Sequence, residues 1–145
     1  MLETITDQGT VIAIIVSHRF HRSGVHFVTD PSYSQQLAYI QHPAGQVIEP
    51  HTHNPVRREV HHTQEVLVIQ KGRLQVDFYN EMKSYLESRV LEAGDTLILV
   101  SGGHGFSVLE NVEMVEVKQG PYAGDADKTR FTGVAASDVM LFDAK

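Results

Sequence analysis

Short β-type runs separated by turn residues are the feature of this sequence that most limits its fold. A sustained 3.6-residue period is scarce, and turn signals such as Lys71-Gly72 interrupt the runs. Roughly nine or ten short strands, with a turn about every 8–12 residues, are typical of a β-sandwich or closed barrel. We therefore predict an all-β fold with little helix. The expected strands span residues 11–16, 24–28, 36–41, 46–53, 65–70, 73–79, 84–91, 96–100, 106–109 and 112–118.

The chain length of 145 residues suits a single domain with one core. The tail from Gly120 to Lys145 is less regular, and either a short helix or a partner-binding strand fits it. We therefore predict one domain over residues 1–145, with an irregular C-terminal tail attached to it.

Composition excludes several classes of site. The chain has no cysteine, so disulfides, thiolate nucleophiles and thiolate-bound metals are ruled out. The formal net charge is −6 and the basic residues are scattered, which argues against nucleic-acid binding and favours a small-molecule ligand. The apolar run 11–16 is too short to span a bilayer and follows Glu3 and Asp7, unlike a signal peptide. We expect a cytoplasmic protein without a membrane partner.

Three histidines and one glutamate have the positions expected of a metal site. His51 and His53 are two residues apart, so on a strand they project from the same face. Glu65 opens a later strand, and His104 follows another strand far along the chain. A barrel would bring all four together. Imidazole and carboxylate suit one divalent ion of Fe, Mn, Ni, Co or Zn, with two positions left open on an octahedral ion.

These residues resemble the two motifs of the cupin family. Gly45, five residues, His51-Thr52-His53, then Glu65, six residues and Gly72 is similar to the first motif, and Gly94 through Gly102 to His104 is similar to the second. The resemblance covers roughly residues 36–118. It implies a double-stranded β-helix barrel of the jelly-roll type, in which His51, His53, Glu65 and His104 bind the metal. Cupins are often dimers, and Val66 and Val68, expected to point away from the barrel, suggest a homodimer.

The sequence departs from the cupin pattern in two places. Eleven residues separate His53 from Glu65, where the family has three or four, and His61 lies four residues before Glu65. His61 or His62 could therefore replace His53, with Glu59 as the other ligand. In the second motif Val100 stands where the family has proline, and His104 comes one residue early.

Residues around these motifs suggest further roles. Arg57 and Arg58 could bind a substrate carboxylate or phosphate at the barrel mouth, or could form a solvated charge cluster. Glu49 is a candidate for acid–base catalysis if side chains continue to alternate across the strand through Pro50, so that Glu49 shares a face with His51. For the other histidines, structural or solvated roles are favoured, and Leu67, Phe78 and Phe106 are expected to fill the barrel.

Three functions fit this pattern, and the sequence carries no substrate signature that selects among them. The first is a metal-dependent enzyme, of the oxygenase or isomerase type, acting on a small polar or anionic metabolite. The second is a non-catalytic cupin that binds a small molecule or a metal. The third is a metal-independent enzyme resembling the cupin isomerases and epimerases of nucleotide sugars, with a histidine as base.

Overall fold

The computed structural model describes residues 1–142, and these residues form an almost entirely β structure. Eleven strands and two short 3-10 helices are present in the described part of the chain, with no α-helix. The predicted all-β class is therefore confirmed. The chain divides into two compact units: unit 1 comprises Met1–Phe20 and the chain from His62 onward, and unit 2 comprises His21–His61.

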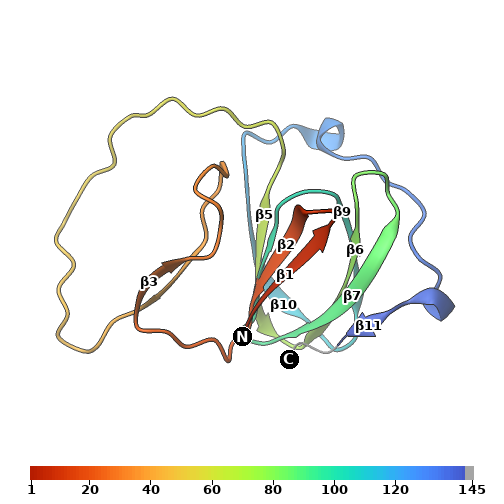
Figure 1. The fold of residues 1–145 in the computed structure, drawn as a ribbon, viewed down its shortest axis with the longest axis horizontal. Coiled ribbons are helices and arrows are strands. Elements are labelled where there is room, and N and C mark those ends of the chain that lie inside the picture. Colours follow the sequence, from red (N-terminus) through yellow and green to blue (C-terminus); the bar gives the residue numbers. More distant parts are fainter. Residues whose placement is uncertain (143–145) are drawn as a thin grey trace. The chain divides into compact units, whose positions relative to one another are not determined.

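Unit 1 contains two sheets that lie face to face (Figure 1). Sheet 1 has the order β1-β2-β8-β5-β10, and all of its neighbours are antiparallel. Sheet 2 has the order β11-β7-β6-β9, antiparallel except for the β11–β7 pair. The strands of sheet 1 are β1 (Leu2–Asp7), β2 (Thr10–Val16), β5 (Glu65–Lys71), β8 (Thr96–Leu99) and β10 (Glu113–Lys118). Those of sheet 2 are β6 (Arg73–Tyr79), β7 (Tyr85–Glu92), β9 (Gly103–Val108) and β11 (Leu141–Phe142).

The core lies between these two sheets. Leu67 and Ile69 reach it from β5, and Val76 and Phe78 reach it from β6. The alternation within each strand places these side chains on the inner face of their sheet, and the burial of apolar area there drives the packing. Leu67 and Phe78 thus fill the interior as the sequence predicts.

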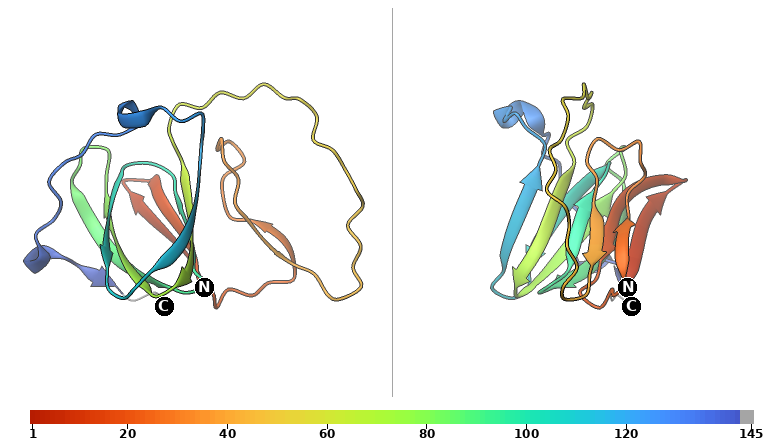
Figure 2. Two further views of the ribbon diagram at one scale, coloured as in Figure 1. Left: turned by 180° about the vertical axis from the view of Figure 1, so that it is seen from behind. Right: turned by 90° about the vertical axis from the view of Figure 1, so that its left-hand side faces the viewer.

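Hydrogen bonding between strands stops at both edges of each sheet. Sheet 1 ends at β1 and β10 and sheet 2 ends at β11 and β9, and no strand pairing within residues 1–142 joins them into a closed barrel. The predicted closed barrel is therefore not what the described residues form. Figure 2 shows the same two sheets from two further sides.

Turns of unit 1 use residues at positive φ, and at Gly72 a side chain does not fit. Gly72 links β5 to β6 with a φ of 78°, and a Cβ there would collide with the backbone carbonyl of Asn111. A left-handed φ is strained for other residues, so glycine is required at this connection between the two sheets. Gln8 and Gly9, also at positive φ, make the turn between β1 and β2. The strand β1 was not among the predicted strands, although Gly9 marks its end.

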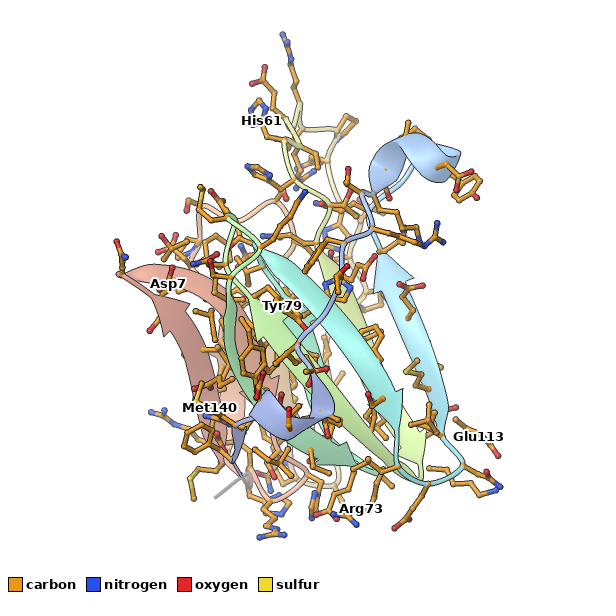
Figure 3. The ribbon with its side chains drawn as sticks, turned by 90° about the vertical axis from the view of Figure 1, so that its right-hand side faces the viewer. Asp7, His61, Arg73, Tyr79, Glu113 and Met140 are labelled. Atoms are coloured by element: carbon orange, nitrogen blue, oxygen red, sulfur yellow. The ribbon has the colours of Figure 1, made fainter. Side chains whose placement is uncertain are left out.

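The C-terminal tail packs on the outer face of sheet 2 and adds a strand to it. The Tyr79 hydroxyl accepts a hydrogen bond from the Val134 amide at 3.0 Å, and the Tyr85 hydroxyl accepts one from Met140 at 2.8 Å. The ring of Phe131 lies 5.0 Å from that of Tyr79. Figure 3 shows Tyr79 beneath the tail. The tail contains η1 (Gly124–Asp127), η2 (Ala136–Asp138) and the short strand β11.

Unit 2 contains one antiparallel pair of strands, β3 (Gly24–Phe27) and β4 (Ala38–Gln41). The buried Thr29 closes the loop between them, because its hydroxyl donates to Gln36 and accepts from the Leu37 amide. The strand predicted over residues 46–53 is absent, and every residue from 41 to 63 is exposed. That prediction is wrong for this structure: within unit 2 the segment has no pairing strand, and Pro50 cannot donate a backbone hydrogen bond.

The short 3-10 helices leave no candidate for a membrane span. In the part of the chain that the structure describes, no helix is both long enough and apolar enough to cross a bilayer.

Candidate functional site

Glu65 and His104 meet between the two sheets of unit 1. Glu65 is the first residue of β5 and shares the inner face of sheet 1 with Leu67. His104 pairs with the fully buried Phe78 across β9 and β6, which places it on the inner face of sheet 2. Their side chains approach with Oε2 of Glu65 3.3 Å from Nε2 of His104. The structure therefore brings together two of the four predicted ligands.

A lysine and an aspartate extend this pair into a chain of charges. Nζ of Lys118 lies 3.4 Å from Oε1 of Glu65 and 3.1 Å from Oδ2 of Asp127. Lys118 ends β10 directly opposite Glu65, and Asp127 ends η1. The hydroxyl of Thr63 donates to Oδ1 of Asp127 at 2.7 Å. Each carboxylate oxygen in this network therefore has one polar partner.

These contacts favour the ionised forms of the network. The hydrogen bond from His104 is the largest cause that lowers the pKa of Glu65, and Lys118 adds to it, while burial opposes both. The hydrogen bond to Asp127 raises the pKa of Lys118. The pKa of Asp127 is lowered, first by the hydroxyl of Thr63 and then by Lys118. Glu65 is thus held as a carboxylate, with its side chain only 15% exposed.

The spacing of Glu65 and His104 fits two ligands of one metal ion. Two atoms each about 2.1 Å from an ion, at right angles or in a tetrahedron, lie about 3.0–3.4 Å apart. The 3.3 Å separation of Oε2 and Nε2 falls in that range. Imidazole nitrogen and carboxylate oxygen also suit first-row transition metals. Within each unit, however, the described residues contain no group of three such side chains that could hold an ion.

His51 and His53 lie together in unit 2. Their rings are 5.4 Å apart at an interplanar angle of 77°, and Nδ1 of His51 contacts the backbone oxygen of Glu49 at 3.0 Å. Both side chains are exposed on the irregular segment that follows β4. The two histidines are therefore neighbours, and an ion bound by all four predicted ligands stays a prediction.

The arginines predicted to contact substrate are solvated. Arg57 and Arg58 lie in the exposed segment of unit 2, and Arg57 makes an ion pair of 3.4 Å with Glu59. Nε2 of His61 lies 3.8 Å from the same carboxylate. The contacts link Arg57, Glu59 and His61, and substrate binding by Arg57 and Arg58 stays a prediction. His62, also exposed, begins the second part of unit 1.

Lys118 and Asp127 were not among the predicted site residues. A signal for Lys118 was present, because Met114, Glu116 and Lys118 alternate on β10 toward the inner face. Asp127 carries no such signal. Its contact with Lys118 depends on how the tail turns at η1, which no periodic pattern specifies.

His18 has the structural role that the sequence favoured. Its backbone amide and its Nδ1 contact Oδ1 of Asp95 at 2.8 and 2.9 Å, and the amide of Glu92 donates to Oδ2 of Asp95. The Asp95 carboxylate is almost fully buried. This network holds the turn between β7 and β8 against the end of β2.

An open cavity of about 360 Å³ lies on the other side of β9 from His104. Gly102 and Gly103 line it together with Lys83 and Phe131. Because Gly103 and His104 are successive strand residues, the His104 side chain points to the opposite face. The cavity is therefore separate from the Glu65–His104 pair.

Comparison with known proteins adds no assignment. No protein-family model matches the chain, and no curated protein or solved structure matches it.

Proposed function

We propose that this chain binds one divalent transition metal through Glu65 and His104 and is a metal-dependent enzyme of the cupin type. The observation that carries the proposal is the 3.3 Å approach of Oε2 and Nε2 between the inner faces of two sheets. The proposed further ligands are His51 and His53. The order of the strands supports a double-stranded β-helix, because successive strands from β7 to β10 alternate between sheet 2 and sheet 1.

The proposed substrate is a small polar or anionic metabolite. When bound, the metal would polarise a substrate oxygen as a Lewis acid, which suits oxygenase or isomerase chemistry. The chain supplies the other elements. The Lys118 ammonium lies beside Glu65 and would attract an anionic group, while Asp127 holds that ammonium in place. The side chain of His104 is about one-third exposed, so ligands can reach the pair.

Metal binding is tested first by elemental analysis of untagged protein and by calorimetric titration with Mn, Fe, Co, Ni and Zn salts. We expect one equivalent of metal in the unaltered chain and a large loss of affinity in Glu65→Gln and His104→Gln. The matched control is His26→Gln, because His26 lies on β3 and its Nε2 contacts the backbone oxygen of Ser23. Equal affinity in all four proteins would refute the site. Turnover is then tested on a metabolite library with and without oxygen. If the metal-loaded protein converts none of these compounds, only metal binding remains of the proposed function.

A second function has support from the same contacts. The Glu65 carboxylate lies 3.3 Å from the His104 ring, an arrangement that fixes the orientation of an imidazole. His104 could therefore transfer a proton to or from a substrate without a metal, as in an isomerase or epimerase. Activity that persists after chelation and disappears in His104→Gln would favour this function over the metal enzyme.

A further inference from the structure

The cavity beside β9 is lined by residues of unit 1 alone, so its walls do not depend on the position of unit 2. Its volume of about 360 Å³ is at the lower end of the range of about 300–1,000 Å³ that ligand sites occupy. The walls come from the turn between β6 and β7, from Gly102 and Gly103, and from the tail. A ligand bound there would lie on the opposite face of β9 from the side chain of His104.

The turn between β6 and β7 is held in one shape by the side chain of Asn80. Its Oδ1 accepts hydrogen bonds from the amides of Met82 and Ser84, both at 3.0 Å. Its Nδ2 donates to Oδ2 of Asp7 on β1 at 3.1 Å. The Lys83 amide also donates to the backbone oxygen of Asn80 at 2.9 Å. Lys83 therefore projects from a backbone that is already fixed before any ligand binds.

Lys83 occupies a backbone position that favours glycine. Its φ is 64°, in the left-handed region where a Cβ causes strain. Strain of this kind indicates function where the side chain does something that glycine cannot do. Nζ of Lys83 lies 5.9 Å from the centre of the Phe131 ring, and both residues line the cavity. The turn therefore keeps an ammonium group at the cavity although glycine would relieve the backbone.

Glu81 and Lys83 bring opposite charges to the same cavity. Both side chains are exposed, and neither makes an ion pair with another residue in the part of the chain that the structure describes. The ring of Phe131 supplies an apolar wall beside them and lies edge-on to Tyr79 at 5.0 Å. Gly103 allows this position of the ring, because a Cβ there would lie 2.9 Å from Cζ of Phe131.

We propose that this cavity binds a free α-amino acid with an aromatic or large apolar side chain. The Lys83 ammonium pairs with the carboxylate of the ligand, and the Glu81 carboxylate pairs with its ammonium. The ligand side chain packs against the ring of Phe131, where aromatic pairs gain more than their buried area alone provides. A zwitterion satisfies both charges at once, whereas a simple carboxylate would meet the like charge of Glu81. This ligand is distinct from the metabolite of the proposed function.

Binding is tested by titrating the isotope-labelled chain with L-phenylalanine and following the backbone amide signals by NMR. We expect the signals of Lys83, Gly102 and Gly103 to shift. Phenylpropanoate and phenylethylamine each lack one of the two charges, so each should bind about threefold more weakly or worse. Absence of binding, or binding of either analogue as tight as that of L-phenylalanine, would overturn the inference. The metal site takes no part in this titration, so its failure leaves the result valid.

Variants of the two charged residues locate the binding. Lys83→Met and Glu81→Gln should each weaken L-phenylalanine binding by about threefold or more, the effect of losing one exposed ion pair. The matched control is Lys71→Met, because Lys71 is an exposed lysine on β5 that pairs with Glu113. Unchanged affinity in Lys83→Met, or an equal loss in Lys71→Met, would contradict the proposal.

Replacement of Lys83 by glycine separates a ligand-binding lysine from a structural one. Gln8 also has a positive φ, 46°, in the turn between β1 and β2, and it does not line the cavity. Lys83→Gly and Gln8→Gly both relieve backbone strain, so neither should lower the urea midpoint of unfolding. Only Lys83→Gly should weaken L-phenylalanine binding. A lower midpoint in Lys83→Gly with unchanged affinity would show that Lys83 serves the fold, and the inference would then be wrong.

Discussion

The carboxylate of Glu65 and the imidazole of His104 come from different sheets of unit 1 and approach to 3.3 Å. Both side chains lie on inner faces, at the end of the sandwich where β5 begins. Because the pair is supplied by two strands that are not hydrogen-bonded to each other, it forms only when the two sheets pack. Variants of these two residues therefore report on the site, while variants elsewhere in the sheets report on the fold.

Replacement of Glu65 should weaken metal binding more than replacement of His61. We expect Glu65→Gln to lower affinity by about 100-fold, because a neutral amide is a poor ligand for a divalent cation. His61→Gln should change affinity little, since His61 is exposed beside Glu59. Calorimetric titration of both variants measures the difference. The reverse order of effects would favour the alternative ligand set built on His61.

The metal affinity should fall as the solution becomes acidic. A histidine binds a metal only when its imidazole is neutral, and an unperturbed imidazole gains a proton near pH 6.5. We therefore expect affinity to decline as the pH falls, because protons compete with the metal for the histidine ligands. Titrations between neutral and mildly acidic pH measure the decline. An affinity that stays flat across this interval would argue against histidine ligands.

Most of the sheet structure of unit 1 could be predicted from the sequence. The runs 65–70 and 73–79 correspond closely to β5 and β6, because alternation and the Lys71-Gly72 turn act locally. Which segments join the edges of the sheets could not be predicted in this way. Whether residues 46–53 form a strand depends on a pairing partner, and the sequence pattern of the segment alone cannot supply one.

The site followed the same division. Glu65 and His104 were predicted from their motif positions, Glu65 at the start of a strand and His104 just after one, and the structure places His104 within β9. Lys118 was not predicted, although the alternation of side chains along β10 places it on the inner face. The contact of Asp127 with Lys118 depends on the path of the C-terminal tail. Sequence periodicity thus predicts which way a strand residue points, whereas contacts made by irregular segments depend on tertiary packing.

Thr63 should control the ionisation of Asp127. The pKa of Asp127 is lowered mainly by the hydroxyl of Thr63, so Thr63→Ala should raise it toward the ordinary value of 3.8. Because the folded-state pKa lies below the unfolded value, the contact stabilises the folded state above the unfolded pKa. That stabilisation is lost as the pH falls through the folded-state pKa. Carbon-13 NMR titration of the aspartate carboxyls follows this change.

Asp30 supplies the control for that titration. The side-chain hydroxyl and backbone amide of Ser32 lower the pKa of Asp30. Ser32→Ala should therefore raise the pKa of Asp30 and leave that of Asp127 unchanged, and Thr63→Ala should do the opposite. Equal shifts of both aspartates in either variant would contradict the local origin of the effect.

Gly72 and Gly9 offer a matched test of what their two turns require. Both glycines have positive φ, at 78° and 86°, but a Cβ at Gly9 meets open space while one at Gly72 meets the backbone carbonyl of Asn111. Gly9→Ala should cost about 1 kcal/mol of folding free energy through backbone strain alone. Gly72→Ala carries the same strain and must also displace the Asn111 backbone, so we expect about 3 kcal/mol or more. Urea unfolding of the two variants gives both values, and equal costs would show that the Asn111 backbone moves aside freely.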